Sequence, residues 1–169
     1  MITLARTAAF CACFAIAACS NATRWDDTNA VNLNNAGTGV AGAASDPASP
    51  AYFQQTVGDR VLFAVDQSSL TRENQLVLEA QANWLLANPD YSATIEGHAD
   101  EQGTREYNLA LGARRANAVR EYLVARGVSA NRLGTVSFGK ERPIEICSEE
   151  SCYAKNRRAV TVLSAGAQG

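Results

Sequence analysis

Four short stretches in the C-terminal two thirds of the chain carry the pattern of β-strands. Residues 61–65 form a continuous apolar run, and apolar and polar residues alternate in 91–97, 133–139 and 158–164. An apolar run of this length or a period of two residues is typical of a strand with at least one buried face. We therefore predict four strands.

Two stretches with a helical period lie between these strands. The first begins after Thr71, a residue suited to cap a helix N-terminus, and stops at Asn88-Pro89. The second covers residues 106–126 and ends at Gly127. The resulting order, β-α-β-α-β-β, predicts an α+β sandwich in which both helices pack on one face of a mixed four-stranded sheet.

The first 18 residues differ from the rest. One arginine precedes an uncharged, apolar run over residues 7–18. This run is shorter than the about 20 residues that a membrane-spanning helix needs, but it suits a cleaved signal peptide. We expect residues 1–18 to direct export of the chain.

The end of this signal, Ile16-Ala17-Ala18-Cys19, resembles the lipobox of bacterial lipoproteins. The resemblance implies that Cys19 carries lipid after cleavage. The alternative is an ordinary signal peptide in which the cysteine stands by chance. Ser20 follows the cysteine and, in lipoproteins of this kind, implies sorting to the outer membrane. We therefore predict a lipid anchor in the outer membrane with the remainder of the chain in the periplasm.

Residues 20–49 contain few large apolar side chains and many Asn, Ala, Gly and Thr residues. Such a segment cannot offset the entropy lost on ordering, so we expect disorder. As a flexible coil, 30 residues span about 30 Å on average. The chain thus divides into a signal (1–18), a lipidated N-terminus with a tether (19–50) and one domain (51–169).

Composition argues against several classes of function. The net charge of −2 gives no basic surface for nucleic acid. The single histidine, His98, is half of a metal site at best, and no serine or cysteine stands in a nucleophile motif. We expect no metal, no cofactor and no enzymatic activity, and we expect His98 to be a residue of a loop or strand end.

The expected location of each part of the chain assigns a role to its five cysteines. Cys11 and Cys13 leave with the signal and Cys19 is lipidated, so Cys147 and Cys152 remain in an oxidising environment. We predict that these two form a disulfide. A metal knuckle has similar spacing, but it lacks a second pair of ligands here.

Arg115 occupies an unexpected place on the second helix. With Asn108 as the origin of the helical wheel, Arg115 falls at about −20°, inside the apolar stripe, whereas Arg114 falls at about −120°, toward water. A guanidinium on the core side is costly unless it is paired and hydrogen-bonded. Two partners remain open: Asp100, in the loop before the helix, or a carboxylate of a ligand.

Several motifs around these residues are similar to the signature of the OmpA-like domain family, most of all to its peptidoglycan-associated lipoprotein branch. The similarity extends from the first predicted strand to the last. The motifs are Gly97-His98-Ala99-Asp100-Glu101-Gln102-Gly103-Thr104, Glu106-Tyr107-Asn108, Leu111-Gly112-Ala113-Arg114-Arg115-Ala116-Asn117-Ala118-Val119, Val136-Ser137-Phe138-Gly139-Lys140-Glu141-Arg142-Pro143 and Lys155-Asn156-Arg157-Arg158-Ala159-Val160.

This resemblance implies an OmpA-like fold and non-covalent binding of peptidoglycan, which links the outer membrane to the wall. Asp100 would receive the ammonium group of diaminopimelate in the stem peptide, and Arg115 would bind the carboxylate on the same carbon. Asn108 would either contact the same ligand or hold the loop. The resemblance also implies a role in the Tol-Pal system of envelope maintenance and cell division, with its periplasmic propeller protein as partner.

The chain departs from the branch pattern at residues 63–66 (Phe-Ala-Val-Asp), at Gln102 and at Arg105. These departures leave Asp100 and Arg115 intact but put the surface for the Tol partner in doubt. Three other functions compete with wall binding. A wall hydrolase lacks its catalytic residues here, a motor-stator subunit needs an uncleaved membrane helix, and a scaffold without wall affinity would pair Asp100 with Arg115 internally.

Overall fold

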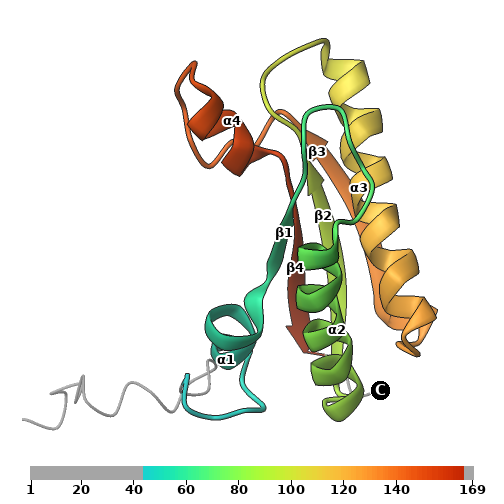
Figure 1. Cartoon of the computed structure of the whole chain (residues 1–169). Helices are drawn as coiled ribbons and strands as arrows, with labels where there is room; N and C mark the ends of the chain where they lie inside the picture. The colour runs from blue at the N-terminus through green and yellow to red at the C-terminus, as the bar shows by residue number, and fades with distance from the viewer. Residues whose placement is uncertain (1–43, 166–169) are drawn as a thin grey trace, which may run out of the picture. The chain divides into compact units, whose positions relative to one another are not determined.

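The computed structural model describes residues 44–165, which contain a four-stranded sheet (Figure 1). The predicted signal peptide, Cys19 and most of the tether lie outside the described residues. The strands are β1 (Arg60–Leu62), β2 (Tyr91–His98), β3 (Leu133–Gly139) and β4 (Arg158–Ala165), in the order β1-β4-β2-β3. β3 pairs with β2 in parallel, and the other two pairings are antiparallel. The sheet is mixed, as predicted.

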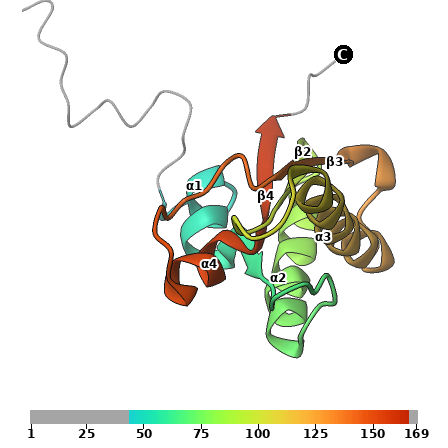
Figure 2. The same cartoon turned by 90° about the horizontal axis from the view of Figure 1, so that it is seen from above.

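Two long helices, α2 (Arg72–Ala87) and α3 (Arg105–Ala125), cover one face of the sheet (Figure 2). Each begins at a threonine whose hydroxyl accepts a backbone N–H of the first turn: Thr71 from Asn74 at 3.3 Å and Thr104 from Tyr107 at 3.2 Å. The α+β fold class and the β-α-β-α-β-β order are confirmed. Within residues 44–165, no helix is long and apolar enough to span a membrane.

Four short elements were not predicted. They are α1 (Pro50–Tyr52), the π-helical turn η3 (Phe53–Gly58), the 3₁₀ turn η4 (Ala130–Arg132) and α4 (Glu150–Asn156). Segments this short contain too few residues to show a helical period. α4 lies immediately before β4, where the sequence suggested only a loop.

The folded part of the chain includes contacts from residues that the sequence placed in the tether. Trp84 in α2 donates from its indole nitrogen to the carbonyl of Pro47 at 2.7 Å. Ser49 is buried, and its hydroxyl accepts the N–H of Tyr52 at 3.0 Å, which caps α1. These contacts hold the start of the domain against the end of α2.

The first strand is shorter than predicted, because β1 ends at Leu62 rather than at Val65. Beyond Leu62 the chain leaves the sheet, and the carbonyls of Ala64 and Gln67 accept hydrogen bonds from Arg115. Apolar composition marked residues 63–65 as strand, but the need to solvate a buried guanidinium determines their conformation.

The core lies between the sheet and the two long helices. Its residues are apolar side chains that are almost fully buried, and aromatic contacts close its lower end, where the rings of Phe53 and Trp84 are 4.9 Å apart. The set comprises Phe53, Val61, Phe63, Leu78, Ala82, Trp84, Leu85, Ala93, Ile95, Ala116, Val119, Leu123, Val128, Leu133 and Ala159.

Cys147 and Cys152 form a disulfide, with 6.0 Å between their Cα atoms. The predicted bridge is therefore present. It joins α4, through Cys152, to the segment that follows β3. Because the closed loop is only about six residues long, the bond restrains α4 locally more than it restrains the whole fold.

The backbones of α3 and β2 approach closely at two glycines. A Cβ atom on Gly97 would lie 1.8 Å from the carbonyl oxygen of Gly112, and a Cβ on Gly112 would lie 2.4 Å from the hydroxyl of Ser137. Neither position has room for a methyl group. Gly112 lies one turn from both Asn108 and Arg115, so this contact fixes the distance of these two residues from the sheet.

Replacement of Gly112 by alanine should therefore destabilise the fold although it raises helix propensity. Pushing α3 off the sheet is expected to cost about 1–3 kcal/mol of unfolding free energy, measured by urea denaturation. Gly134→Ala in β3 is the matched control, because its added methyl would lie 3.6 Å from the Thr94 hydroxyl, an ordinary contact. Equal stability of the two variants would refute the proposed role of this contact.

Candidate functional site

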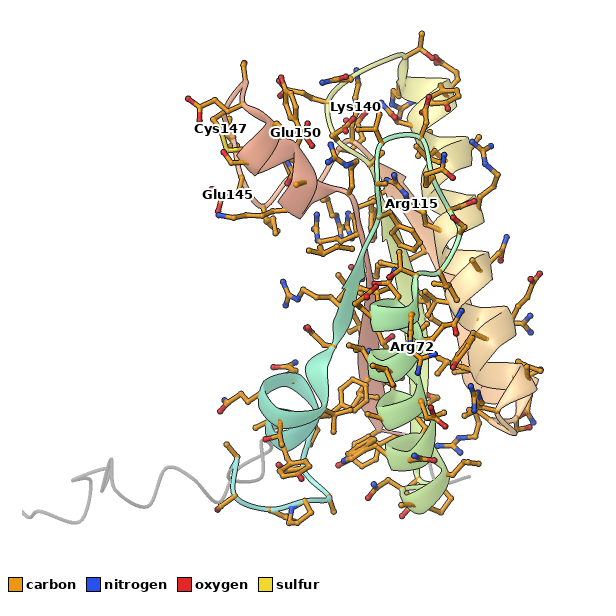
Figure 3. The ribbon with its side chains drawn as sticks, in the orientation of Figure 1. Arg72, Arg115, Lys140, Glu145, Cys147 and Glu150 are labelled. Atoms are coloured by element: carbon orange, nitrogen blue, oxygen red, sulfur yellow. A yellow bond between two sulfur atoms is a disulfide. The ribbon has the colours of Figure 1, made fainter. Side chains whose placement is uncertain are left out.

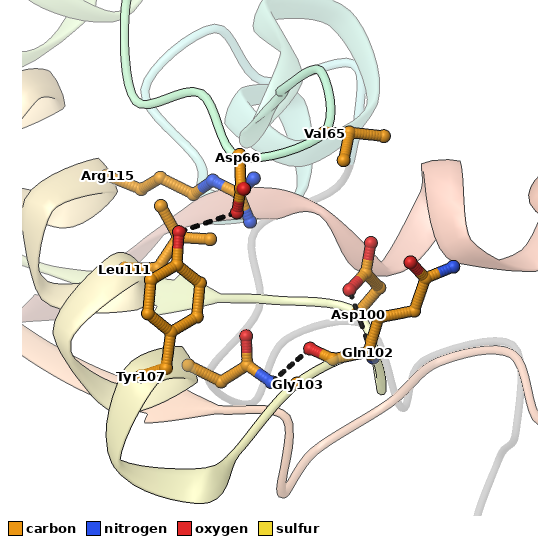
Figure 4. Close-up of a pocket in the computed structure, with 9 residues that line it drawn as sticks. Val65, Asp66, Asp100, Gln102, Gly103, Tyr107, Leu111 and Arg115 are labelled. Carbon is orange, nitrogen blue, oxygen red and sulfur yellow. Dashed lines mark hydrogen bonds between the residues drawn. The ribbon is translucent and has the colours of Figure 1, made fainter.

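A pocket of about 180 Å³ opens at the end of the sheet where the loop after β1, the loop after β2 and the first turns of α3 meet. Figure 4 shows the side chains around it. The pocket brings together the three residues predicted from the sequence, Asp100, Asn108 and Arg115. The full lining is Val65, Asp66, Asp100, Gln102, Gly103, Tyr107, Asn108, Leu111 and Arg115.

Arg115 forms the floor of this pocket and is buried, as its place in the apolar stripe predicts, while Arg114 is exposed. Its guanidinium lies between α3 and the loop after β1 (Figure 3). Three backbone carbonyls accept its N–H groups: Gln67 at 2.8 Å, His98 at 2.8 Å and Ala64 at 3.1 Å. These oxygens, rather than an anion, provide the partners that the sequence demanded.

The charge of Arg115 persists in this environment. Burial lowers its pKa to about 10, an effect that nearby Asp100 opposes, so the group is a cation at neutral pH. A guanidinium has five N–H groups, and the three carbonyls occupy three of them. Two N–H groups of Arg115 therefore remain beyond these three bonds, and Arg115 lines an open pocket.

Asp100, one of the two partners that the sequence left open for Arg115, forms its ion pair with Arg157 instead. Its Oδ2 accepts Nη1 of Arg157 at 3.1 Å, and its Oδ1 accepts the N–H of Gln102 at 3.2 Å. Arg157 is thus a member of the site that sequence reasoning missed. The signal was present, because Arg157 and Arg158 stand together at the start of an apolar strand, where an unpaired cation would be costly.

Asn108 holds the loop that carries Asp100. Its side chain is buried, and its amide nitrogen donates to the carbonyl of Gln102 at 2.8 Å. Lys140, in the turn after β3, supports the same loop by donating to the carbonyl of Gly103 at 2.8 Å. Asn108 also lines the pocket, so its place is compatible with ligand contact as well. Leu111 is buried and contributes apolar surface to the pocket lining.

Asp66 and Tyr107 meet at the pocket, a pairing that the sequence did not reveal. The Tyr107 hydroxyl donates to a carboxylate oxygen of Asp66 at 2.6 Å, and this bond raises the pKa of the tyrosine (Figure 4). Asp66 has a φ of 58°, in the left-handed region that few residues other than glycine and asparagine or aspartate adopt. Its carboxylate lies near the guanidinium of Arg115 and adds negative charge to that side of the pocket.

His98 lies at the end of β2, as expected for a strand-end residue, but its ring is not among the pocket lining. The ring is 2% exposed, stacks on Phe138 and has no hydrogen-bond partner at either nitrogen. Burial, together with the charges of Arg158 and Arg142, lowers its pKa to about 4. Among residues 44–165, no group of three or more His, Cys, Asp or Glu side chains is arranged to hold a metal ion.

The depressed pKa of His98 predicts acid sensitivity. The unfolded chain binds a proton at this residue near pH 6.5 and the folded chain only near pH 4, so stability that is present above pH 6.5 is lost as the pH falls toward 4. We expect the unfolding free energy to drop by roughly 1–3 kcal/mol between pH 7 and pH 4.5.

Urea titrations at several pH values measure this loss. Because the chain has one histidine, His98→Phe, which can retain the stacking on Phe138, should flatten the curve between pH 7 and 5. Carboxylates that titrate below pH 5 are left in place as an internal reference. Parallel curves for the two proteins would assign the acid sensitivity to other groups.

The sequence of this chain matches the model of the OmpA family over residues 62–157, and the chain belongs to that family. Two relatives are both named peptidoglycan-associated lipoprotein. The one from Rhizobium meliloti is 55% identical over 134 residues, covering 78% of this chain and 76% of the relative. The one from Mesorhizobium japonicum is 47% identical over 156 residues, covering 92% and 89%.

Solved structures agree with this assignment. The peptidoglycan-associated lipoprotein from Burkholderia pseudomallei superimposes with a TM-score of 0.64 at 39% identity, covering 72% of this chain and 98% of that one. The C-terminal domain of Helicobacter pylori MotB gives a TM-score of 0.60 at 23% identity over 64% of this chain and 86% of that one. The latter likeness extends to the fold alone. Together they support an OmpA-like sandwich.

Proposed function

We propose that this protein binds peptidoglycan non-covalently and without catalysis, and so holds the outer membrane to the cell wall. The observation that carries the proposal is the state of Arg115: a buried cation, fixed by three carbonyls, with two N–H groups left over at a pocket that also contains Asp100. A cation held in this way is pre-organised for a carboxylate, because the entropy cost of fixing its side chain has already been met by the fold.

The ligand proposed is the zwitterionic end of diaminopimelate in the stem peptide. A carbon that bears both an ammonium and a carboxylate needs one anion and one cation at a short separation. Asp100 supplies the anion and Arg115 the cation, and both line the same small pocket. Asn108 holds the Asp100 loop and is placed to contact the same ligand.

A scaffold without wall affinity is the main competing function. That function would leave Asp100 and Arg115 paired with each other, whereas Asp100 pairs with Arg157 and Arg115 with carbonyls. The two groups are therefore separate charges that a zwitterion can bridge. This separation favours ligand binding over an internal lock.

Asp100→Asn is the sharpest test of the site. The amide keeps the shape of the carboxylate and one acceptor oxygen but removes its charge, which leaves the ligand ammonium unpaired in a desolvated place. We expect the affinity for purified diaminopimelate-type sacculi to fall on the order of 30-fold or more, equivalent to about 2–5 kcal/mol. Co-sedimentation of the purified protein in detergent over a range of sacculus concentrations measures this affinity.

Glu106→Gln is the control for Asp100→Asn, because Glu106 is an exposed acid in the first turn of α3 and the charge change is the same. It should bind like wild type. Arg115→Ala should also abolish binding, but it leaves three carbonyls without their donor and lowers stability; Arg114→Ala, on the exposed side, should do neither. Wild-type affinity of Asp100→Asn would eliminate this assignment.

The proposal includes the envelope location. The lipobox Ile16-Ala17-Ala18-Cys19, the Ser20 that follows it and the polar tether support a lipid anchor at Cys19 in the outer membrane, with the domain in the periplasm. The resemblance to the peptidoglycan-associated lipoprotein branch supports the Tol-Pal system as the setting, with its periplasmic propeller protein as partner.

Cys19→Ser tests the anchor. Without the thiol no lipid can be attached, so the protein should appear unprocessed or soluble rather than in outer-membrane vesicles. Mass spectrometry of the wild-type N-terminus gives the direct measurement, because a triacylated Cys19 has a characteristic mass. A wild-type N-terminus without lipid would contradict the proposal.

A further inference from the structure

Arg157 is a buried cation that pairs with an exposed carboxylate, that of Glu150. Its side chain is 5% exposed, and Nε donates to the carbonyl of Phe63 at 3.1 Å. Nη1 donates to Asp100 at 3.1 Å and also to Glu150 at 3.4 Å, while Nη2 forms an ion pair with Glu150, whose side chain is 66% exposed. The bond to Glu150 is the largest cause of the raised pKa of Arg157. Arg157 therefore lies between two carboxylates, one in the pocket and one at the surface.

This arrangement limits how Arg157 can approach Asp100. An arginine with a single carboxylate neighbour commonly forms a two-pronged pair that occupies both carboxylate oxygens. Here Glu150 engages Nη2 and also accepts from Nη1, so Asp100 receives only one N–H from Arg157. The other oxygen of Asp100 accepts one backbone N–H, from Gln102. Each oxygen of Asp100 thus retains a lone pair for a further donor.

The helix that carries Glu150 is fixed to the site by independent contacts. Tyr153 of α4 donates from its hydroxyl to Glu101, the neighbour of Asp100, at 2.9 Å. The Cys147–Cys152 disulfide ties α4 to the preceding segment, on the side where Glu150 begins the helix (Figure 3). At the other end, Asn156 bonds the backbone of Glu145 at 2.8 Å. Glu150 is consequently presented to Arg157 from a restrained helix.

Two cations, Arg115 and Arg157, and three carboxylates, of Asp66, Asp100 and Glu150, lie in or beside the pocket. Arg115 and Arg157 lie close enough for Arg157 to lower the pKa of Arg115, and Asp100 and Glu150 offset them. Removing Glu150 would take one negative charge from the site and free Arg157 to take both oxygens of Asp100, and both changes oppose an incoming ammonium.

We propose that Arg157, held by Glu150, is a positioning residue for Asp100, and that α4 in this way supports the ligand site. This inference rests on the proposed function, because it assigns to Asp100 the ammonium of the wall peptide. Glu150 itself is not among the residues that line the pocket. It keeps Arg157 from neutralising the carboxylate that the ligand needs.

The experiment uses Glu150→Gln in the full-length protein, because Glu150 is exposed and its loss should not unfold the domain. Affinity for diaminopimelate-type sacculi should fall about five- to tenfold, with a melting temperature within about 2 °C of wild type. Glu149→Gln is the matched control, since it removes the same charge one residue away and the Glu149 side chain makes no capping bond. It should bind like wild type.

A double-mutant cycle separates positioning from a general structural effect. If Glu150 acts through Asp100, Glu150→Gln should change affinity less than twofold in the Asp100→Asn background, measured at sacculus concentrations that saturate that variant. An equal loss in both backgrounds, an equal loss in Glu149→Gln, a marked drop in melting temperature or unchanged binding by Glu150→Gln would each overturn the inference. Failure of the wild type to bind sacculi would instead overturn the proposed function.

Discussion

The buried guanidinium of Arg115 is the constraint on which the rest of the pocket depends. A cation in the core must find acceptors, and here it takes them from the backbone of two segments, at Ala64, Gln67 and His98. This requirement draws the chain out of the sheet after Leu62 and shapes the loop that forms one wall of the pocket. A single side chain thus determines where a strand stops and where a binding surface begins.

Charge alternates outward from that point. The floor cation is followed by the Asp100 carboxylate, then by Arg157 and finally by Glu150 at the surface. Each ion limits the freedom of the next, so the pocket carboxylate is neither paired with the floor cation nor fully neutralised. A pocket of this kind can offer opposite charges to one ligand although both charges are held within a few ångströms of hydrophobic core.

The spacing of apolar residues was sufficient to predict the strands of the sheet, the two long helices and the burial of Arg115, because each depends on a pattern that extends over several residues. The disulfide followed from counting cysteines by compartment. The partners of Arg115 could not be predicted, because every residue has a backbone carbonyl and the side-chain pattern does not show which carbonyls lie near the guanidinium. The Asp100–Arg157 pair joins residues 57 positions apart, and such a pairing needs the sheet register, which composition does not supply. For the same reason the Asp66–Tyr107 contact was missed, whereas α4, with seven residues, is too short to show a helical period.

The three hydrogen bonds of Arg115 connect residues that are 17, 48 and 51 positions apart. No local piece of the chain can therefore assemble the pocket: α3 must dock on the sheet, and the β1–α2 loop must close over it, before the guanidinium has its acceptors. Long-range contacts of this kind form late and slowly during folding, because the chain loses conformational entropy on closing the loop before the contact can stabilise it. Ligand recognition is accordingly confined to chains that have completed their topology, because a half-folded domain has no acceptors that hold the guanidinium of Arg115 in place.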